Sequence, residues 1–436
     1  MEIVDTLVTK TAWLGEFPAH WEVLRIKNLF QEMDSRSETG NEELLSVSYY
    51  TGVTLKRESL ENEDDHITNA LSLVGYKIVA KDDLIINIMG AWNGRLGISP
   101  YNGITSPAYC VYRLKGNNNP EYFGYLFTTN LFISEFRKNS TGIGSGFLRL
   151  YSDKLFSIFS VVPPKEEQDE IVQHIKEQSE KINQFIQKKK RFIELLKEQR
   201  QNIINHVVIK GINPSAKMKI SGINWLGEVP QHWEVRRFGT LGEFSKGGNI
   251  SRSDLAEIKT DFPAILYGDI YTKYDIKAET ILNFISEETA LNSTEIKSGD
   301  LLLTGSGETK IDIGKCIVYL GSEKVFVGGD VIIFKQTSFD SLFLSYSLNS
   351  DYSRMQKAIS SKGDIIVHTY GSKLKNVILP IPPIEEQKHI VFHIKTQTAN
   401  IDTTIAKTER EIGLIREYKE AMISEAVMGK RNINLQ

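Results

Sequence analysis

The chain has 436 residues, of which 41% are hydrophobic and 25% are charged, so it is long enough for about two or three globular domains. It carries no apolar run that could span a bilayer, and its N-terminal segment lacks the basic start and apolar core of a signal peptide, so we expect a cytoplasmic protein. The formal net charge is −3 and neither end is a basic or acidic tail, so bulk charge does not favour binding to nucleic acid.

The chain repeats itself, and the repeat begins at Trp13. The segment WLGEFPAHWEVLR at 13–25 returns as WLGEVPQHWEVRR at 225–237. A second echo pairs LFSIFSVVPPKEEQDEIVQHI with KNVILPIPPIEEQKHIVFHI, and it places Gln168 opposite Gln387. A third, fainter echo lies between them and pairs Asp83 with Asp300, Gly90 with Gly307 and Gly97 with Gly314. Three echoes in one order indicate that the whole unit is duplicated, which predicts pseudo-two-fold symmetry.

Each copy begins with a mixed domain, predicted at 1–162 in the first half and at 224–381 in the second. Short β-like runs such as DDLIINIM, YCVYRL, DLLLTG and KCIVYL are separated by glycines, and longer stretches such as PEYFGYLFTTNLFISEFRKN have helical spacing. Cys110 and Cys316 lie in such apolar runs without metal-ligand spacing, and we interpret them as buried or half-buried thiols. The predicted fold class is α/β (α+β), with two mixed α/β domains.

A long helix follows each mixed domain. The helices are predicted at 163–211 and 382–430, a polar linker at 212–223 separates the halves, and a short tail occupies 431–436. Both helices open on Pro-Pro followed by acidic residues, which suits a helix N-terminus, and a glycine stands at the end of each.

Apolar residues in both helices recur every seven residues, which is typical of a coiled coil. The matching rows are Ile175, Ile182, Lys189, Leu196 and Ile203 in the first helix and Ile394, Ile401, Thr408, Ile415 and Met422 in the second. We expect Ile171, Phe185, Phe192 and Val207 to interleave with the first row. The simplest packing is an intramolecular antiparallel coiled coil, a rod of about 65 Å at ~1.5 Å rise per residue, with one globular domain at each end.

These segments, together with MGAWNGRLGI and STGIGSGFLRLYSDKLFSIFSVVPPKEEQ, resemble the specificity subunit of type I restriction-modification enzymes over nearly the whole chain. The doubled Pro-Pro-x-Glu-Glu-Gln is a specific part of the resemblance. The resemblance implies that each mixed domain is a target recognition domain that reads one half of a bipartite, asymmetric site in double-stranded DNA, while the helices set the gap. It also implies a non-catalytic chain that recruits two methyltransferase subunits, which use the cofactor S-adenosylmethionine to methylate adenine, and motor-nuclease subunits.

Base-reading side chains are expected on glycine-flanked loops that carry Arg, Lys, Asn, Gln, Ser or Thr. The heads of this family vary most in these loops, so no motif transfers residue by residue. The candidates are Arg57, Asn93, Arg95, Arg137 and Lys138 in the first head and Lys246, Asn249, Arg252, Lys310 and Lys362 in the second. Trp92 would either stack on a base or pack inside the head.

Two other functions stay open. Asp300, Glu308 and Lys310 imitate the Asp…Glu-x-Lys layout of metal-dependent nucleases, so the chain could be a self-contained nuclease. It could also be a duplicated coiled-coil scaffold that binds protein and no DNA. The sequence lacks the Asn/Asp-Pro-Pro-Tyr/Phe motif of adenine methylation, a glycine-rich phosphate loop and a His-Glu-x-x-His metal pattern.

The remaining repeated residues have structural interpretations. Trp13, Trp21, Trp225 and Trp233 are predicted to pack the entry of each head against the end of the rod, with docking of a partner as the alternative. The acidic pairs Glu166–Glu167 and Glu385–Glu386 are expected in first helical turns rather than in acid/base catalysis. The basic run KKKR at 188–191 is either a solvated face or a contact to the phosphates of the unread spacer.

Overall fold

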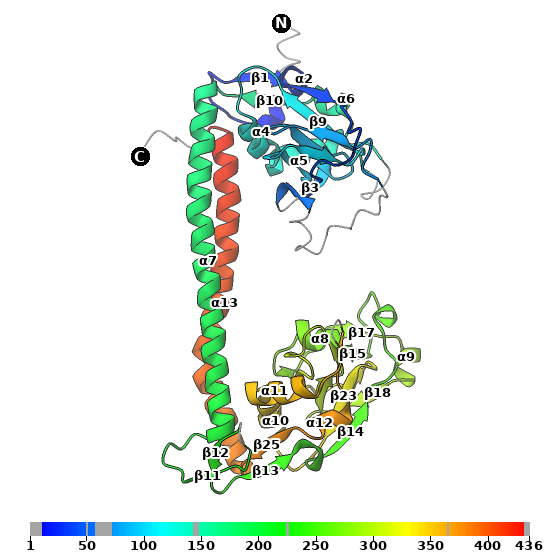
Figure 1. Cartoon of the computed structure of the whole chain (residues 1–436), viewed down its shortest axis with the longest axis vertical. Coiled ribbons are helices and arrows are strands. Elements are labelled where there is room, and N and C mark those ends of the chain that lie inside the picture. Colours follow the sequence, from blue (N-terminus) through cyan, green and yellow to red (C-terminus); the bar gives the residue numbers. More distant parts are fainter. Residues whose placement is uncertain are drawn as a thin grey trace. The chain divides into compact units, whose positions relative to one another are not determined.

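The computed structural model describes residues 11–48, 51–56, 72–142, 148–223, 226–363 and 366–430. The chain divides into two compact units, the first made of 1–189 and 410–436 and the second of 190–409. Each unit contains one globular head and a part of each long helix (Figure 1). Within the residues described, no helix combines the length and the apolarity that crossing a bilayer requires.

The first head is built on a four-stranded antiparallel sheet in the order β2–β9–β6–β7. Its elements are η1 (Ala12–Leu14), β1 (Glu22–Arg25), α2 (Ile26–Leu29), β2 (Phe30–Met33), β3 (Leu45–Ser48), β4 (Gly52–Leu55), β5 (Lys77–Val79), β6 (Leu84–Asn87), η2 (Ala91–Asn93), β7 (Leu96–Ile98), β8 (Gly103–Thr105), β9 (Tyr109–Leu114), α4 (Pro120–Phe127), α5 (Asn130–Asn139), α6 (Ser152–Ser157) and β10 (Phe159–Val162). Every residue of β6 is buried. Leu84 and Ile86 face the aromatic core of α4 and α5, whereas Ile85 faces the β3–β4 hairpin, because successive side chains of a strand point to opposite faces.

The second head repeats this sheet as β14–β23–β19–β21 and adds β16 at its edge, beside a further four-stranded sheet in the order β17–β15–β22–β18. Its elements are β11 (Met218–Ile220), β12 (Glu228–Pro230), β13 (Glu234–Arg237), η4 (Phe238–Thr240), β14 (Glu243–Lys246), η5 (Arg252–Asp254), β15 (Pro263–Ile265), α8 (Tyr267–Thr272), β16 (Lys277–Ala278), β17 (Asn283–Phe284), α9 (Glu287–Leu291), β18 (Thr294–Ile296), β19 (Leu301–Thr304), β20 (Ser306–Gly307), β21 (Cys316–Tyr319), β22 (Val325–Val327), β23 (Val331–Lys335), α10 (Ser341–Leu348), α11 (Asp351–Ser360), β24 (Val367–His368), α12 (Gly371–Leu374) and β25 (Ile378–Ile381). The two heads therefore share a central sheet and differ in what surrounds it.

Strand register corrects one detail of the third echo. Leu84 pairs with Ile98 in the first head, and its counterpart Leu301 pairs with Val318 in the second. The residue that corresponds to Gly314 is therefore Gly94 and not Gly97, and both of these glycines have positive φ, 69° and 84°. The sequence alignment failed here because the connecting loop, 88–95 in the first head, is longer in the second, where it spans 305–315.

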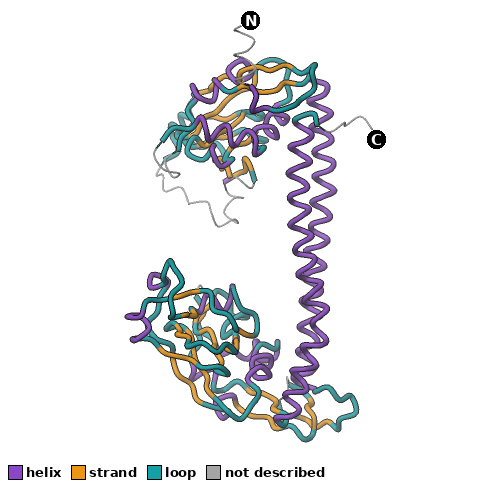
Figure 2. Tube along the Cα trace, turned by 180° about the vertical axis from the view of Figure 1, so that it is seen from behind, coloured by secondary structure: helices purple, strands orange, loops and turns teal. Residues whose placement is uncertain are grey.

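The long helices are α7 (Lys165–Lys210) and α13 (Ile384–Val427), which Figure 2 shows as two continuous helical traces. In the first unit the start of α7, with Ile171 and Ile175, shares a buried core with the end of α13 at Met422. In the second unit the end of α7, with Ile204 and Val207, shares a core with the start of α13, with Ile390 and Ile394. Start meets end in both units, so the helices pack antiparallel and the predicted mixed fold with two antiparallel helices is confirmed.

The predicted interleaving row was wrong in its middle. Phe185 and Phe192 are 43% and 42% exposed, whereas their neighbours Ile186 and Ile193 are each 8% exposed. One residue turns a helix by about 100°, so only one of two adjacent apolar rows can enter the seam. The polar position Lys189 is satisfied, because its Nζ lies 2.8 Å from a carboxylate oxygen of Glu411.

Candidate nucleic-acid interface

The doubled opening segment joins each head to both long helices. In the first unit, Trp21 donates from Nε1 to a carboxylate oxygen of Glu167 at 2.9 Å, and Nε2 of His20 lies 2.7 Å from the other oxygen. The opposite side of Trp21 faces Gly429, the glycine that ends α13 with a φ of 65°, where an added Cβ would lie 2.9 Å from the ring. The segment thus ties the first turn of one helix to the last turn of the other.

The second unit repeats this junction. Nε2 of His232 lies 2.7 Å from a carboxylate oxygen of Glu386, and the buried Trp233 packs against Gly211 at the end of α7. The prediction of structural anchors is confirmed for Trp21 and Trp233, and Trp225 lies outside the described residues. Glu167 and Glu386 hold the side chains of these junctions, as expected for acidic residues in a first helical turn rather than for a catalytic pair.

The glutamine of Pro-Pro-x-Glu-Glu-Gln fixes each head to its helix. The Gln168 side chain accepts from the backbone N–H of Asn119 at 2.8 Å and donates to the carbonyl of Pro163 at 2.8 Å. The Gln387 side chain accepts from the backbone N–H of Asp340 at 2.9 Å and donates to the carbonyl of Pro382 at 2.8 Å. Both glutamines are buried, so the same bidentate contact orients both heads.

In the first head, four of the predicted reading residues come from two elements that touch. The loop 88–95 folds back on itself, since Arg95 donates its N–H to the carbonyl of Gly90 at 3.0 Å. The guanidinium of Arg137 on α5 lies 5.8 Å from the centre of the Trp92 ring, and the indole N–H of Trp92 donates to the carbonyl of Met89 at 2.8 Å. Trp92 is half-buried, and these contacts hold its ring against the loop.

The polar atoms of this group differ in exposure and in hydrogen bonding. The side-chain oxygen of Asn93 is buried and has no hydrogen-bond partner among the described residues. Arg95 is exposed, and Lys138 is exposed beside Arg137, with its Nζ 3.3 Å from Glu135. Arg57 lies outside the described residues.

In the second head, backbone hydrogen bonds bring three loops together. The N–H of Gly247 donates to the carbonyl of Val331 at 2.9 Å, and the N–H of Gly305 donates to the carbonyl of Asp330 at 2.7 Å. The N–H of Lys362 donates to the carbonyl of His368 at 3.0 Å. A Cβ at Gly247 would lie 2.0 Å from the carbonyl oxygen of Gly328, so only glycine permits this approach.

These contacts join the segments that carry the predicted reading residues of the second head. Lys246 and Asn249 flank the close approach at Gly247, Lys310 lies on the loop 305–315, and Lys362 is bridged to the end of β24. Arg252 opens η5 a few residues further along. All five side chains are exposed.

The three residues of the nuclease alternative are not brought together. Asp300 precedes β19 and Glu308 and Lys310 follow its other end, so the strand separates them by about 13 Å at ~3.3 Å per residue. Asp300 is 8% exposed and accepts from the backbone N–H of Lys297 at 2.9 Å. Its counterpart Asp83 accepts from Ala80 at 2.8 Å, so this aspartate caps the same turn in both heads.

Sequence reasoning missed a buried lysine beneath the loop 305–315. Lys357 on α11 is fully buried and donates from Nζ to the carbonyl of Gly314 at 2.6 Å. Burial lowers the pKa of this amine to about 8. Its counterpart on α5 is Phe136, also fully buried, so no pattern in the sequence distinguished Lys357 from a surface lysine.

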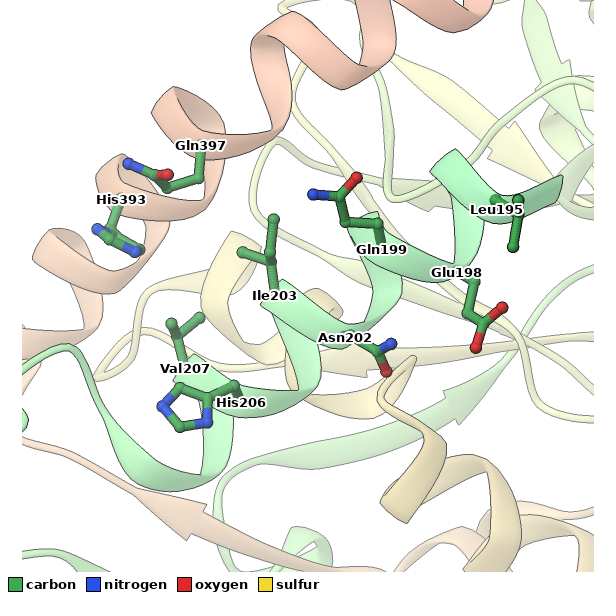
Figure 3. A pocket seen from close by; sticks show the side chains of 9 residues that line it. All are labelled: Leu195, Glu198, Gln199, Asn202, Ile203, His206, Val207, His393 and Gln397. Atoms are coloured by element: carbon green, nitrogen blue, oxygen red, sulfur yellow. The ribbon is translucent and has the colours of Figure 1, made fainter. Parts of the chain in front are cut away.

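A groove of about 570 Å³ lies apart from these loops, on the helices of the second unit. Figure 3 shows its lining side chains, His393 and Gln397 from α13 and the others from α7. The lining mixes amides, histidines and aliphatic residues with Glu198 and contains no lysine or arginine, so it suits a protein better than a phosphate backbone.

Comparison with known proteins identifies both halves of the chain. The family model described as the type I restriction modification DNA specificity domain matches residues 18–195 and 230–412. The type I restriction enzyme MjaVIII specificity subunit of Methanocaldococcus jannaschii is 25% identical over 435 residues, which are 96% of this chain and 95% of the relative. The type I restriction enzyme EcoKI specificity subunit of Escherichia coli is 24% identical over 208 residues, 47% of this chain and 44% of the relative.

A solved structure of similar fold supports this assignment of the fold. It comes from work on complex assembly and conformational transition of the type I R-M system, and it covers 95% of this chain and 100% of its own, with a TM-score of 0.62 and 15% identity.

Proposed function

From the premise that this chain belongs to the family of type I restriction modification DNA specificity domains, we propose that each of its two heads reads one half of a bipartite, asymmetric DNA target. The observation that carries the proposal is a shared frame with different loops. Both heads have the same central sheet and the same junction to the helices, but the loop after the central strand is 88–95 in one and 305–315 in the other. Different loops on one frame present different donors and acceptors to the bases, so the half-sites differ.

The long helices set the gap between the half-sites. α7 is one helix of 46 residues, about 69 Å at ~1.5 Å per residue, and α13 has 44 residues. Base pairs within the gap are not read. The run at 188–191 is exposed at Lys188, Lys190 and Arg191, which suits a sequence-independent contact to the phosphates of the gap.

The chemistry belongs to partner subunits in this proposal. The chain recruits two methyltransferase subunits, which bind S-adenosylmethionine, and motor-nuclease subunits join them. Exposed apolar side chains on the helices, such as Phe185, Phe192 and Leu414, and the groove at His206 and His393 support a protein partner on this part of the chain. A scaffold that binds protein and no DNA conflicts with membership of a DNA specificity family.

Exchange of one head tests the proposal. Residues 224–381 are replaced by the corresponding head of another specificity subunit, and the hybrid is co-expressed with the methyltransferase subunit of this system. Native sequencing of host DNA for N6-methyladenine is expected to show a split motif in which one half is new and the other half and the gap are unchanged. A change in both halves, with the complex shown to be assembled, would contradict independent reading by the heads.

A further inference from the structure

The two heads share a short surface segment that the reading of bases does not explain, and within it Arg149 and both tyrosines are exposed while His368 is half-buried. It is Arg149-Leu150-Tyr151 in the first head and His368-Thr369-Tyr370 in the second, and we call it the basic–tyrosine segment. The middle residue is buried in both heads, while Tyr151 and Tyr370 are 44% and 57% exposed. Because alternate side chains of an extended segment share a face, the basic residue and the tyrosine lie on the same outer face.

Equivalent backbone hydrogen bonds hold the segment in both heads. Arg149 is bridged to Thr141, with both N–H···O distances at 2.9 Å, and His368 is bridged to Lys362 at 2.8 and 3.0 Å. The backbone N–H of the middle residue donates to the carbonyl of the first residue after the central strand. In the first head Leu150 donates to Ile88 at 3.0 Å, and in the second head Thr369 donates to Gly305 at 2.9 Å. The segment is thus fixed beside the loop that carries the predicted reading residues.

The outer side chains have unused donors. Arg149 is exposed, and its guanidinium makes no hydrogen bond or ion pair within the part of the chain that the structure describes. Nδ1 of His368 lies 3.0 Å from Oγ of Ser306, and when Ser306 donates to it, the ring proton is on Nε2 and free to bind a ligand. The hydroxyls of Tyr151 and Tyr370 have no partner among the described residues.

We propose that the basic–tyrosine segment holds the DNA sugar–phosphate backbone in each head. Arg149 and His368 donate to phosphate oxygens, and Tyr151 and Tyr370 contact the adjoining phosphate or sugar. The inference rests on the proposed function, which places DNA against these loops. Residues that read different half-sites must differ between the heads, whereas a contact that is the same in both heads suits the part of DNA that is the same in every sequence.

The test measures affinity and salt dependence on the assembled complex. The full chain is prepared with its methyltransferase subunit as wild type, as Arg149→Ala/Tyr151→Ala and as His368→Ala/Tyr370→Ala, and titrated with a duplex that carries the methylated motif found in the host. Each double variant is expected to bind roughly tenfold more weakly. Arg149→Ala alone is expected to reduce the slope of log affinity against log salt by about 1, because one phosphate contact is lost.

Two exposed lysines provide matched controls. Lys81 precedes the central strand of the first head and Lys324 follows β21 in the second, so both lie at the opposite end of the sheet from the segment. Lys81→Ala and Lys324→Ala are expected to leave affinity and slope unchanged, and equal melting temperatures of all variants show that they fold.

The methylated motif distinguishes the outcomes. The inference predicts an unchanged motif in cells that express the double variants, with methylation reduced at every site alike. Unchanged affinity, or a motif altered in one half-site, would overturn it, since the latter marks a base contact. If the wild-type complex itself shows no split motif, the proposed function fails and the inference falls with it.

Discussion

The buried amine of Lys357 makes the stability of the second head depend on pH. Below pH 8 the amine is charged in the folded and the unfolded chain, so the cost of burying its charge is fully present. Between about pH 8 and the ordinary lysine value of 10.5 the unfolded chain binds more protons than the folded chain, so the free energy of unfolding rises with pH.

Replacement of this lysine is expected to stabilise the head at neutral pH. Lys357→Met should raise the free energy of unfolding at pH 7 by up to about 3 kcal/mol, less about 1 kcal/mol for the lost hydrogen bond to Gly314. Urea unfolding at pH 7 and pH 10 measures the difference between variant and wild type, which should shrink at the higher pH. Burial also lowers the pKa values of Lys315 and Lys419. Both residues are present in the wild type and in the variant, so their contributions cancel in the difference between the two proteins. A difference that is the same at both pH values would refute this account.

The two junction tryptophans have equivalent positions but unequal hydrogen bonding. Trp21 donates to Glu167, whereas the indole N–H of Trp233 is buried without a partner in the described residues. Trp21→Phe should therefore lower stability by about 1–3 kcal/mol more than Trp233→Phe, because only the first change breaks a hydrogen bond. Scanning calorimetry of the two variants measures this, and equal losses would count against the contact to Glu167.

At the level of elements, the long helices show what the sequence could and could not predict. The seven-residue row through Lys189 and Thr408 is buried or half-buried along both helices, and the hydroxyl of the buried Thr408 donates to the carbonyl of Thr404 in its own helix. The second row was misplaced by one residue because Phe185 and Phe192 are followed at once by Ile186 and Ile193. Spacing cannot choose between two adjacent apolar rows, since the choice depends on which face meets the other helix.

The seam is open to direct test at this level. Ile193→Ala should lower the free energy of unfolding by about 2–4 kcal/mol, because a buried side chain leaves a cavity. Phe192→Ala, one residue away and half exposed, is the matched control and should cost about 1 kcal/mol or less. Urea unfolding compares them, and a larger loss for Phe192→Ala would restore the row predicted from the sequence.

The heads were predictable in class but not in loop geometry. The echoes gave the duplication and the entry anchors, because tryptophan, proline and glutamine at fixed contacts tolerate little change. The register at Gly314 had no sequence signal because it depends on the length of one loop, and the burial of Lys357 had none because its counterpart Phe136 is an ordinary core residue. The reading residues stay a prediction, although the backbone does bring Asn93, Arg95 and Arg137 into one group.

The whole molecule should respond to a change in helix length. Insertion of one heptad into α7 together with one into α13 lengthens the helical pair by about 10.5 Å, which corresponds to at most about three base pairs of DNA. The methylated motif should keep both half-sites and gain a longer gap, as read by native sequencing of host DNA. An unchanged gap would show that the helices do not set the spacing.

The central claim concerns sequence recognition by the intact chain. The most direct measurement is native sequencing of N6-methyladenine in cells that express the methyltransferase subunit with this chain and without it. The account predicts methylation at one split, asymmetric motif that disappears when the chain is omitted. Methylation that is absent in the assembled complex, or whose motif does not depend on this chain, would contradict it.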